Sequence, residues 1–150
     1  MNNPECRATA RLLVFDENDC LVLTKRKPVA KQRAGQWDIP GGAVEPGELY
    51  LDAAVREAQE ELTIKIDKTL VRPKPIYCEY NFDLSTREWF GRYYYLYTGS
   101  LAVEQAVTLT EADAKCQVTL QRAQEIMSYV PHQRAVSQLE TMVQTGALVA

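Results

Sequence analysis

The sequence predicts a single α/β domain over residues 1–150, in which a mixed β-sheet is sandwiched between helices. Strand-like segments, rich in apolar and aromatic residues, occur both before and after one strongly helical segment. Two further helical segments follow near the end of the chain. No internal repeat or low-complexity segment divides it. The order strands, helix, strands, helices is typical of a mixed sheet with helices packed on it.

The first part of the chain predicts a β-hairpin and a loop. Residues 8–15 (ATARLLVF) and 20–26 (CLVLTKR) read as paired strands, joined by a turn over 16–19 (DEND). Residues 27–36 are polar and contain proline and glycine, which predicts a loop. A short extended piece over 37–39 ends at the Pro-Gly-Gly that follows it.

The helix over residues 49–62 (LYLDAAVREAQEEL) is the best-defined element, because it is rich in helix-forming residues and contains no glycine or proline. The remaining elements are predicted from aromatic content or helical periodicity. They are strands over 76–82 and 89–98 and helices over 120–129 and 133–144, with Pro131 between the two helices.

Composition and charge exclude several classes of function. The net charge is −3, from 17 basic and 20 acidic residues, so the chain has no global attraction for a nucleic-acid polymer or an anionic membrane. No apolar run approaches the roughly 20 residues of a membrane span. Residues 1–11 lack the apolar segment of a secretory signal, so a cytoplasmic location is expected. The expected partner is a small molecule, bound by a monomer or homodimer.

The cysteines and the single histidine restrict the chemistry further. Four cysteines lie far apart with no CxxC pair, which favours buried free thiols over disulfides or a zinc site. His132 is the only histidine, so a multi-histidine metal site is excluded. It follows Pro131 in a polar stretch, and a structural or surface role is favoured over a place in a Ser-His-Asp triad.

Three carboxylates share one face of the helix over residues 49–62. At about 100° per residue, Leu51, Val55, Ala58 and Leu62 form the expected buried stripe. Glu57, Glu60 and Glu61 lie together away from that stripe, at the spacing i, i+3, i+4. Like charges at this spacing oppose helix formation by a few tenths of a kcal/mol per pair. The face is either a solvated acidic surface or a site for a hard divalent cation such as Mg²⁺.

The flanking residues favour the metal site. Residues 42–64 (GAVEPGELYLDAAVREAQEELTI) resemble the Nudix box of the MutT-like hydrolases, and the preceding GQWDIPG resembles its usual lead-in. The matching positions are Gly42, Glu48, Arg56, Glu57, Ala58, Glu60, Glu61 and Ile64. The six polar or glycine matches would arise by chance on the order of once in 10⁷ start positions. The chain is therefore identified as resembling the Nudix superfamily, which implies the Nudix fold.

The resemblance implies Mg²⁺, or Mn²⁺ in its place, as the cofactor. It places the metal ligands at Glu57, Glu60, Glu61 and the Gly41 carbonyl. Glu48 would support these ligands, and Arg56 would hold a glutamate in position. A surface ion pair of little energetic value is the alternative for Arg56. The general base would be one of the glutamates of the box or Glu111. For Glu111, a role as an ordinary exposed acid at a helix start is an equally good interpretation.

Substrate contacts are expected beside the box. The densest group of basic residues in the chain lies just before the box and consists of Lys25, Arg26, Lys27 and Arg33. Arg26 is the first candidate for a phosphate contact, and an ordinary solvated basic loop is the alternative. Trp37, Tyr80 and Trp89 are candidates for stacking on a base, although packing within the core is the favoured explanation for any one of them.

One position departs from the box. Thr63 stands where the family has a second glycine, which usually takes the left-handed conformation at a helix end. A β-branched residue fills that conformation poorly, so the turn after the helix is expected to differ.

The resemblance implies Mg²⁺-dependent hydrolysis of a diphosphate linkage, with a nucleoside di- or triphosphate, (d)NTP above all, as the favoured substrate. A dinucleoside polyphosphate hydrolase is the first alternative. A Nudix-fold module that binds a nucleotide without cutting it is the second. The module is disfavoured because such proteins usually lose glutamates of the box, and all of them are present here.

Overall fold

The computed structural model describes residues 6–102 and 112–147. Within them, seven strands form one mixed sheet. Its central order is β3-β2-β1-β6-β5, with β4 paired to β1 and β7 paired to β2. The strands are β1 Cys6–Asp16, β2 Leu21–Arg26, β3 Trp37–Asp38, β4 Gly41–Ala43, β5 Tyr77–Asp83, β6 Glu88–Leu101 and β7 Ala112–Val118.

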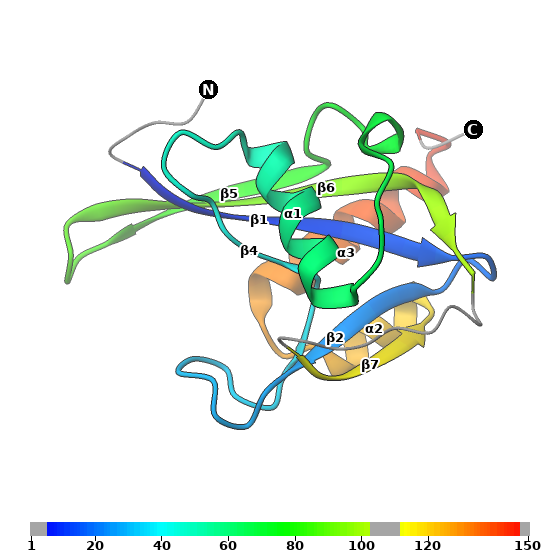
Figure 1. Ribbon diagram of the computed structural model, residues 1–150, viewed down its shortest axis with the longest axis horizontal. Helices are drawn as coiled ribbons and strands as arrows, with labels where there is room; N and C mark the ends of the chain where they lie inside the picture. Colours follow the sequence, from blue (N-terminus) through cyan, green and yellow to red (C-terminus); the bar gives the residue numbers. More distant parts are fainter. Residues whose placement is uncertain (1–5, 103–111, 148–150) are drawn as a thin grey trace.

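Helices cover both faces of this sheet, which confirms the predicted sandwich. In Figure 1, α1 lies in front of the strands and α2 and α3 lie behind them. The helices are α1 Tyr50–Leu62, α2 Leu120–Ile126 and α3 Val130–Gln144, with a 3-10 helix, η1, at Lys68–Leu70. The β5–β6 hairpin extends beyond the rest of the sheet at one end (Figure 1).

Strand β1 shows why the sheet has two cores. Successive side chains of a strand point to opposite faces. The even-numbered residues Ala8, Ala10, Leu12 and Val14 pack in the core under α1. Leu13 packs in the second core, which α2 and α3 complete. Because both faces of its second half are buried, residues 12–15 (LLVF) form a continuous apolar run, which is typical of a buried strand.

Some boundaries differ from those expected. Strands β4 and β7 were not predicted, because β4 is three residues long and β7 has a polar sequence. The second helix ends at Ile126 instead of Tyr129. The third begins at Val130, so Pro131 lies in its first turn and does not separate two helices. Proline is accepted there because the first-turn N–H groups have no partner within the helix.

Helix α1 buries a broader face than the predicted stripe. Val55, Ala58 and Leu62 are buried as expected, but Ala53 and Ala54 are buried too, and Leu51 is only partly buried. The small alanine side chains let the helix lie close to β1 and β4. The carboxylates that follow on α1 are thereby held near the backbone of β4.

Cysteines Cys20, Cys78 and Cys116 are free, as predicted, but Cys78 is exposed and the other two are half-buried. Their expected burial was therefore wrong. Among the described residues, no helix combines the length and the apolar character needed to cross a membrane.

The end of α1 corrects the expectation for Thr63. Thr63 adopts the left-handed conformation itself, with φ 53° and ψ 45°. The turn has the geometry that glycine would give it, although the residue is β-branched. A non-glycine residue in this conformation carries a cost of about 1–2 kcal/mol.

Thr63→Gly is expected to relieve this strain. Glycine adopts φ near +53° without a steric penalty, but it also loses more conformational entropy on folding. We expect a net gain of about 1 kcal/mol in the free energy of unfolding relative to Thr63→Ala, measured by denaturant titration. The alanine variant is the matched control, because it removes the hydroxyl but retains the Cβ atom. Equal stability of the two variants would contradict the proposed strain.

Candidate active site

Arg56 gathers the acidic residues on one side of α1. Its Nε donates to Glu48 Oε2 at 2.8 Å, and its Nη1 donates to Glu57 Oε1 at 2.9 Å. Nη2 donates to the Ala43 carbonyl at 3.1 Å, which ties the helix to β4. Glu60 Oε2 lies 3.5 Å from Nη1. The guanidinium therefore fixes Glu48 and Glu57 and approaches Glu60, and its hydrogen bond to Glu48 lowers the pKa of that carboxyl.

Two glycines let β4 lie close to its neighbours on both sides, Gly42 to the acidic helix and Gly41 to β1. A Cβ atom on Gly42 would lie 2.6 Å from the carboxyl carbon of Glu57, so any side chain there would displace this carboxylate. A Cβ on Gly41 would lie 2.5 Å from the carbonyl oxygen of Ala10, a backbone atom that cannot move aside. Gly42 thus places the backbone of β4 against the Glu57 carboxylate, and Gly41 lets the same strand pair closely with β1.

Glu61 has a different environment from Glu57 and Glu60. Burial raises its pKa to about 8, with the charge of Arg11 and a hydrogen bond with the Gly41 backbone acting in the opposite direction. The negative charges of Asp38 and Glu57 add to the increase. The protein alone therefore does not supply enough positive charge to stabilise the ionised carboxylate of Glu61.

These groups fit a hard divalent cation by their chemistry. Glu57, Glu61 and the Gly41 carbonyl offer oxygen atoms, the donors that Mg²⁺ prefers. A cation beside Glu61 would also favour its ionised form. Among the described residues, however, no three histidine, cysteine or acidic side chains already converge at metal-binding geometry. Glu57 is instead turned toward Arg56.

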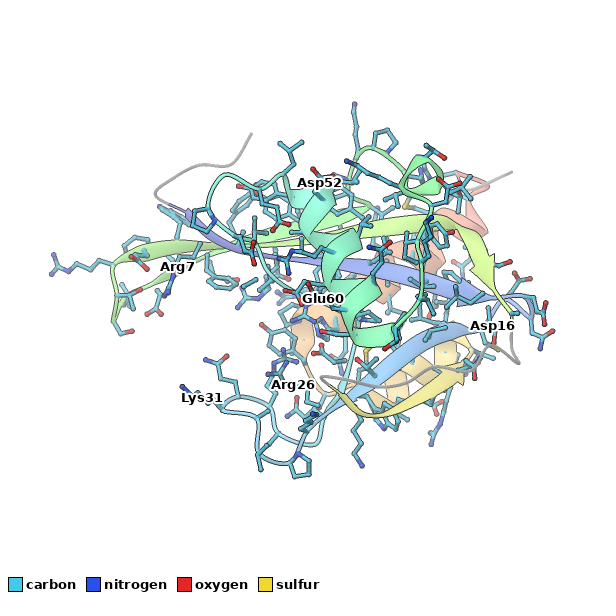
Figure 2. All side chains as sticks on the ribbon, in the orientation of Figure 1. Arg7, Asp16, Arg26, Lys31, Asp52 and Glu60 are labelled. Atoms are coloured by element: carbon cyan, nitrogen blue, oxygen red, sulfur yellow. The ribbon has the colours of Figure 1, made fainter. Side chains whose placement is uncertain are left out.

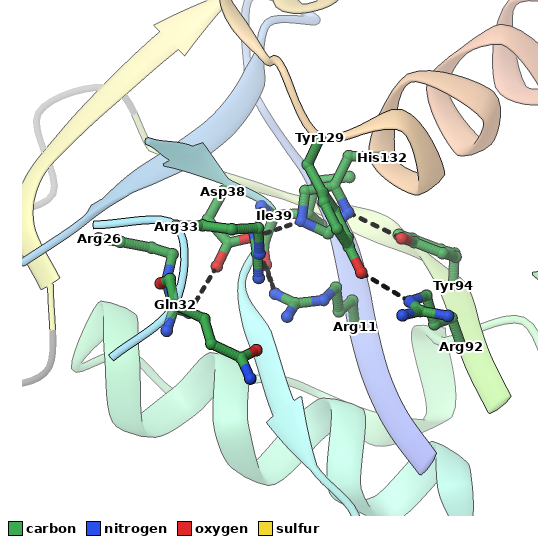
Figure 3. A network of polar contacts seen from close by, with 10 residues as sticks. All are labelled: Arg11, Arg26, Gln32, Arg33, Asp38, Ile39, Arg92, Tyr94, Tyr129 and His132. Carbon is green, nitrogen blue, oxygen red and sulfur yellow. Dashed lines mark hydrogen bonds and ion pairs between the residues drawn. The ribbon is translucent and has the colours of Figure 1, made fainter. Parts of the chain in front are cut away.

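A second cluster centres on Asp38, whose side chain is only 5% exposed (Figure 3). Arg11 Nη1 lies 3.0 Å from Oδ1, Arg33 Nη1 lies 3.4 Å from Oδ1, and Arg26 Nη1 lies 3.2 Å from Oδ2. His132 Nε2 also bonds to Oδ1. Burial would raise the pKa of Asp38, but the Arg11 charge and the bond to His132 hold this pKa well below its usual range. Three guanidiniums face one carboxylate, so the cluster carries excess positive charge.

A cavity of about 250 Å³ joins the acidic and basic groups. Its wall includes Glu61 from α1 and Arg26 from the end of β2. The other lining residues are Thr24, Lys25, Lys27, Val29, Ala30 and Asp38. Figure 2 labels Glu60 in the last turns of α1 and Arg26 at the end of β2. A buried carboxyl with a raised pKa and a group of basic side chains thus share one cavity.

The remaining candidate residues lie around this cavity or outside it. Arg33 reaches Asp38 from loop 27–36, and its guanidinium stacks on the Tyr129 ring at 4.0 Å. Tyr80 is half-exposed on β5, where its ring packs edge-on against Tyr93, and it is absent from the lining of the cavity that the structure describes. Glu111 lies outside the described residues.

The prediction from sequence missed Asp38 and Arg11 as parts of the site. Arg11 was a visible signal, as the one charged residue within the apolar segment ATARLLVF. His132 is fully buried, which is consistent with the structural role favoured from the sequence, and its hydrogen bond to Asp38 makes it part of the Asp38 cluster. Its partner lies 94 residues away, so no local pattern could reveal this contact.

Comparison with known proteins gives a family and a fold. The family model described as the NUDIX domain matches residues 6–139. The CTP pyrophosphohydrolase of Escherichia coli (strain K12) is 43% identical over 49 residues, which cover 33% of this chain and 36% of that protein. The chain spans only 32–42% of the length of the first curated relatives it matches.

Solved structures agree over nearly the whole chain. The crystal structure of a MutT protein from Methanosarcina mazei Go1 has a TM-score of 0.74 and 20% identity, covering 94% of this chain and 97% of the other. A Caenorhabditis elegans Ap4A hydrolase binary complex has a TM-score of 0.68 and 22% identity, covering 93% and 98%. At these identities the likeness establishes the mixed sheet between helices and leaves the substrate open.

Proposed function

Because this chain belongs to the Nudix family, we propose that it hydrolyses a diphosphate linkage in a nucleoside triphosphate, (d)NTP, and releases the monophosphate. The family generally uses divalent metal ions such as Mg²⁺. The bond broken would join the oxygen between the α- and β-phosphates to either the α- or the β-phosphorus. Water would supply the hydroxyl group to the phosphorus that is attacked.

One observation carries the proposal: Glu61 and Arg26 line the same cavity. Hydrolysis of a diphosphate needs oxygen ligands for a cation and positive groups for the phosphate oxygens, within one substrate length of each other. Lys25 and Lys27 add positive charge to the same wall. A nucleotide-binding module would need the positive groups but would gain nothing from a buried carboxylate with a raised pKa.

The residues take distinct roles in the proposed reaction. Glu57, Glu60 and Glu61 would hold Mg²⁺ with the Gly41 carbonyl, and Arg56 would orient Glu57 through their 2.9 Å bond. Bound Mg²⁺ would neutralise phosphate charge and lower the pKa of a coordinated water. Arg26 would bind phosphate oxygens. A glutamate of the box or Glu111 would accept the proton of the attacking water.

A panel of nucleotides with Mg²⁺ tests the substrate class. It includes ATP, GTP, CTP, the four dNTPs, 8-oxo-dGTP and a diadenosine polyphosphate, with the nucleotide products separated by chromatography and any released diphosphate or phosphate measured. Turnover of nucleoside triphosphates above the dinucleotide supports the proposal. A preference for the dinucleotide would indicate the dinucleoside polyphosphate activity instead. Tight binding of one nucleotide with no product would indicate a binding module.

Arg26→Ala is expected to lower kcat/KM by about 10-fold or more for every substrate in the panel, because a lost charged hydrogen bond costs about 1.5–3 kcal/mol. A phosphate contact carries no information on the base, so the ranking of substrates should stay the same. Lys31→Ala is the matched control, since Lys31 is an exposed basic residue of the loop that follows Arg26 (Figure 2). A loss confined to one base would show that Arg26 reads the base and not the phosphate.

A further inference from the structure

His132 is buried where three parts of the fold meet. It lies in the first turn of α3, with none of its surface exposed. Its Nδ1 bonds to the hydroxyl of Tyr94 on β6 at 2.7 Å, and its Nε2 bonds to Asp38 on β3. The Tyr129 ring packs edge-on against the imidazole, with centroids 4.7 Å apart. Figure 3 shows this chain of contacts running from β6 through α3 to β3.

The partners of His132 determine its tautomer. Burial and the charge of Arg11 lower the pKa of His132 to about 4, so the ring is neutral at physiological pH. Asp38 is ionised and can only accept a hydrogen bond, so Nε2 carries the proton. Nδ1 then accepts from the Tyr94 hydroxyl. The imidazole therefore donates to Asp38 in a single orientation.

Asp38 distributes its two oxygens between different partners. Oδ1 accepts from His132, from Arg11, from Arg33 at 3.4 Å and from the backbone N–H of Ile39 at 3.1 Å. Oδ2 accepts from Arg26 at 3.2 Å. The bonds to Oδ1 fix the carboxylate plane, so they also fix the direction in which Oδ2 holds the Arg26 guanidinium.

The two outer arginines of this cluster keep part of their surface open, and Arg26 lines the cavity. The side chain of Arg26 is 30% exposed and that of Arg33 is 18% exposed, whereas that of Arg11 is 7% exposed. Arg26 also donates from Nε to the Gln32 carbonyl at 2.9 Å. The bonds of Arg26 to the Gln32 carbonyl and to Asp38 use two of the five N–H groups of its guanidinium. The remaining N–H groups can bind an anion.

We propose that His132 is a positioning residue for the phosphate-binding arginines, acting through Asp38 on Arg26 and Arg33. A helix at the end of the chain thereby sets the geometry of a site formed by β2 and the loop after it. The inference rests on the proposed function, because it concerns the arginines that would bind the phosphates of the substrate. His132 touches no substrate in this arrangement and exchanges no proton with it.

Paired substitutions test this role. His132→Leu removes the N–H donor at similar size, whereas His132→Gln can present its amide N–H near the position of Nε2. Val136→Ala is the control for packing, because Val136 is buried in the same core one turn further along α3. His132→Met replaces the leucine variant if that protein does not fold. Each variant is compared at a temperature where melting curves show it to be fully folded.

The measurement is calorimetric binding of inorganic diphosphate in metal-free buffer, which isolates the arginines from any cation. We expect His132→Leu to weaken binding about 10-fold, and His132→Gln and Val136→Ala to stay within about 3-fold of the wild type. Equal binding by the leucine variant and Val136→Ala would overturn the proposal, as would a wild type that binds no diphosphate.

Turnover separates this inference from the function on which it rests. For the best nucleotide of the panel, His132→Leu should raise KM about 10-fold with a smaller change in kcat, because ground state and transition state lose the same contact. A wild type that binds diphosphate but hydrolyses no nucleotide would overturn the proposed function alone. The positioning role would then be judged from the binding constants.

Discussion

Glu61→Gln is expected to lower kcat by about 10²-fold or more and to leave the fold intact. The substitution preserves the size and helix propensity of the side chain but removes the negative charge that would hold the cation. A metal ligand that contributes several kcal/mol to the transition state corresponds to a loss of this size. Steady-state kinetics with saturating Mg²⁺ provide the measurement. Glu125→Gln, on the exposed surface of α2, is the matched control for loss of a carboxylate.

The stability of the same variant gives an independent check. Because the folded-state pKa of Glu61 is raised to about 8, the metal-free folded protein binds a proton more tightly than the unfolded chain does. The stability contributed by this proton is fully present below the unfolded pKa of about 4.3 and is lost as the pH rises through about 8. Melting temperatures of the wild type should therefore fall over this window relative to those of Glu61→Gln.

Two results would contradict this role of Glu61. Normal turnover with a normal melting curve would place the metal elsewhere. A parallel pH dependence in wild type and variant would mean that Glu61 is not the buried, uncompensated carboxylate described above. Glu57→Gln then becomes the informative variant, because Glu57 lies against Gly42 and is already paired with Arg56.

The spacing of apolar residues along the sequence predicted the main elements of the fold, because each buried face of a helix or strand requires apolar residues at regular positions. Helix α1 buries one face and β1 buries both, so each left a clear apolar pattern in the sequence. The strands that were missed had no such pattern. Strand β4 owes its pairing to the close approach that Gly41 permits, and β7 pairs with β2 through the backbone of a polar sequence.

The acidic half of the candidate site was predictable and the basic half only partly so. Glu57, Glu60 and Glu61 lie within five residues of one helix, so their common face follows from the helical repeat alone. Arg26 and Arg33 were identified from their density in the sequence, but their common partner was not. Asp38 joins them from β3, and His132 of α3 bonds to the same carboxylate from 94 residues away.

At Thr63, packing of the neighbouring residues outweighs the conformational preference of the residue itself. The sequence predicted an altered turn because a β-branched residue disfavours the left-handed conformation. The structure retains that conformation, since Leu62 and Ile64 on either side are buried in the core under α1. Burial of two such side chains is worth about 3–6 kcal/mol, which exceeds the strain of about 1–2 kcal/mol.

Removal of divalent cations is expected to abolish turnover, and Mg²⁺ or Mn²⁺ should restore it. The reason is the environment of Glu61, where the protein leaves a buried carboxylate without enough positive charge, and the substrate adds further negative charge to the same cavity. The measurement is nucleotide hydrolysis after treatment with a chelator, followed by titration with MgCl₂. Full turnover in metal-free buffer would rule out the proposed hydrolytic mechanism.

Binding of the cation should also be visible without substrate. At Mg²⁺ concentrations about 100 times its dissociation constant, a folded-state site stabilises the protein by about 2.7 kcal/mol, which corresponds to a rise of roughly 5–11 °C in Tm at this chain length. Glu61→Gln should lose most of this rise, whereas Glu125→Gln should keep it. A rise of the same size in Glu61→Gln would show that Mg²⁺ binds without Glu61, and the loss of activity in that variant would then need a cause other than the metal.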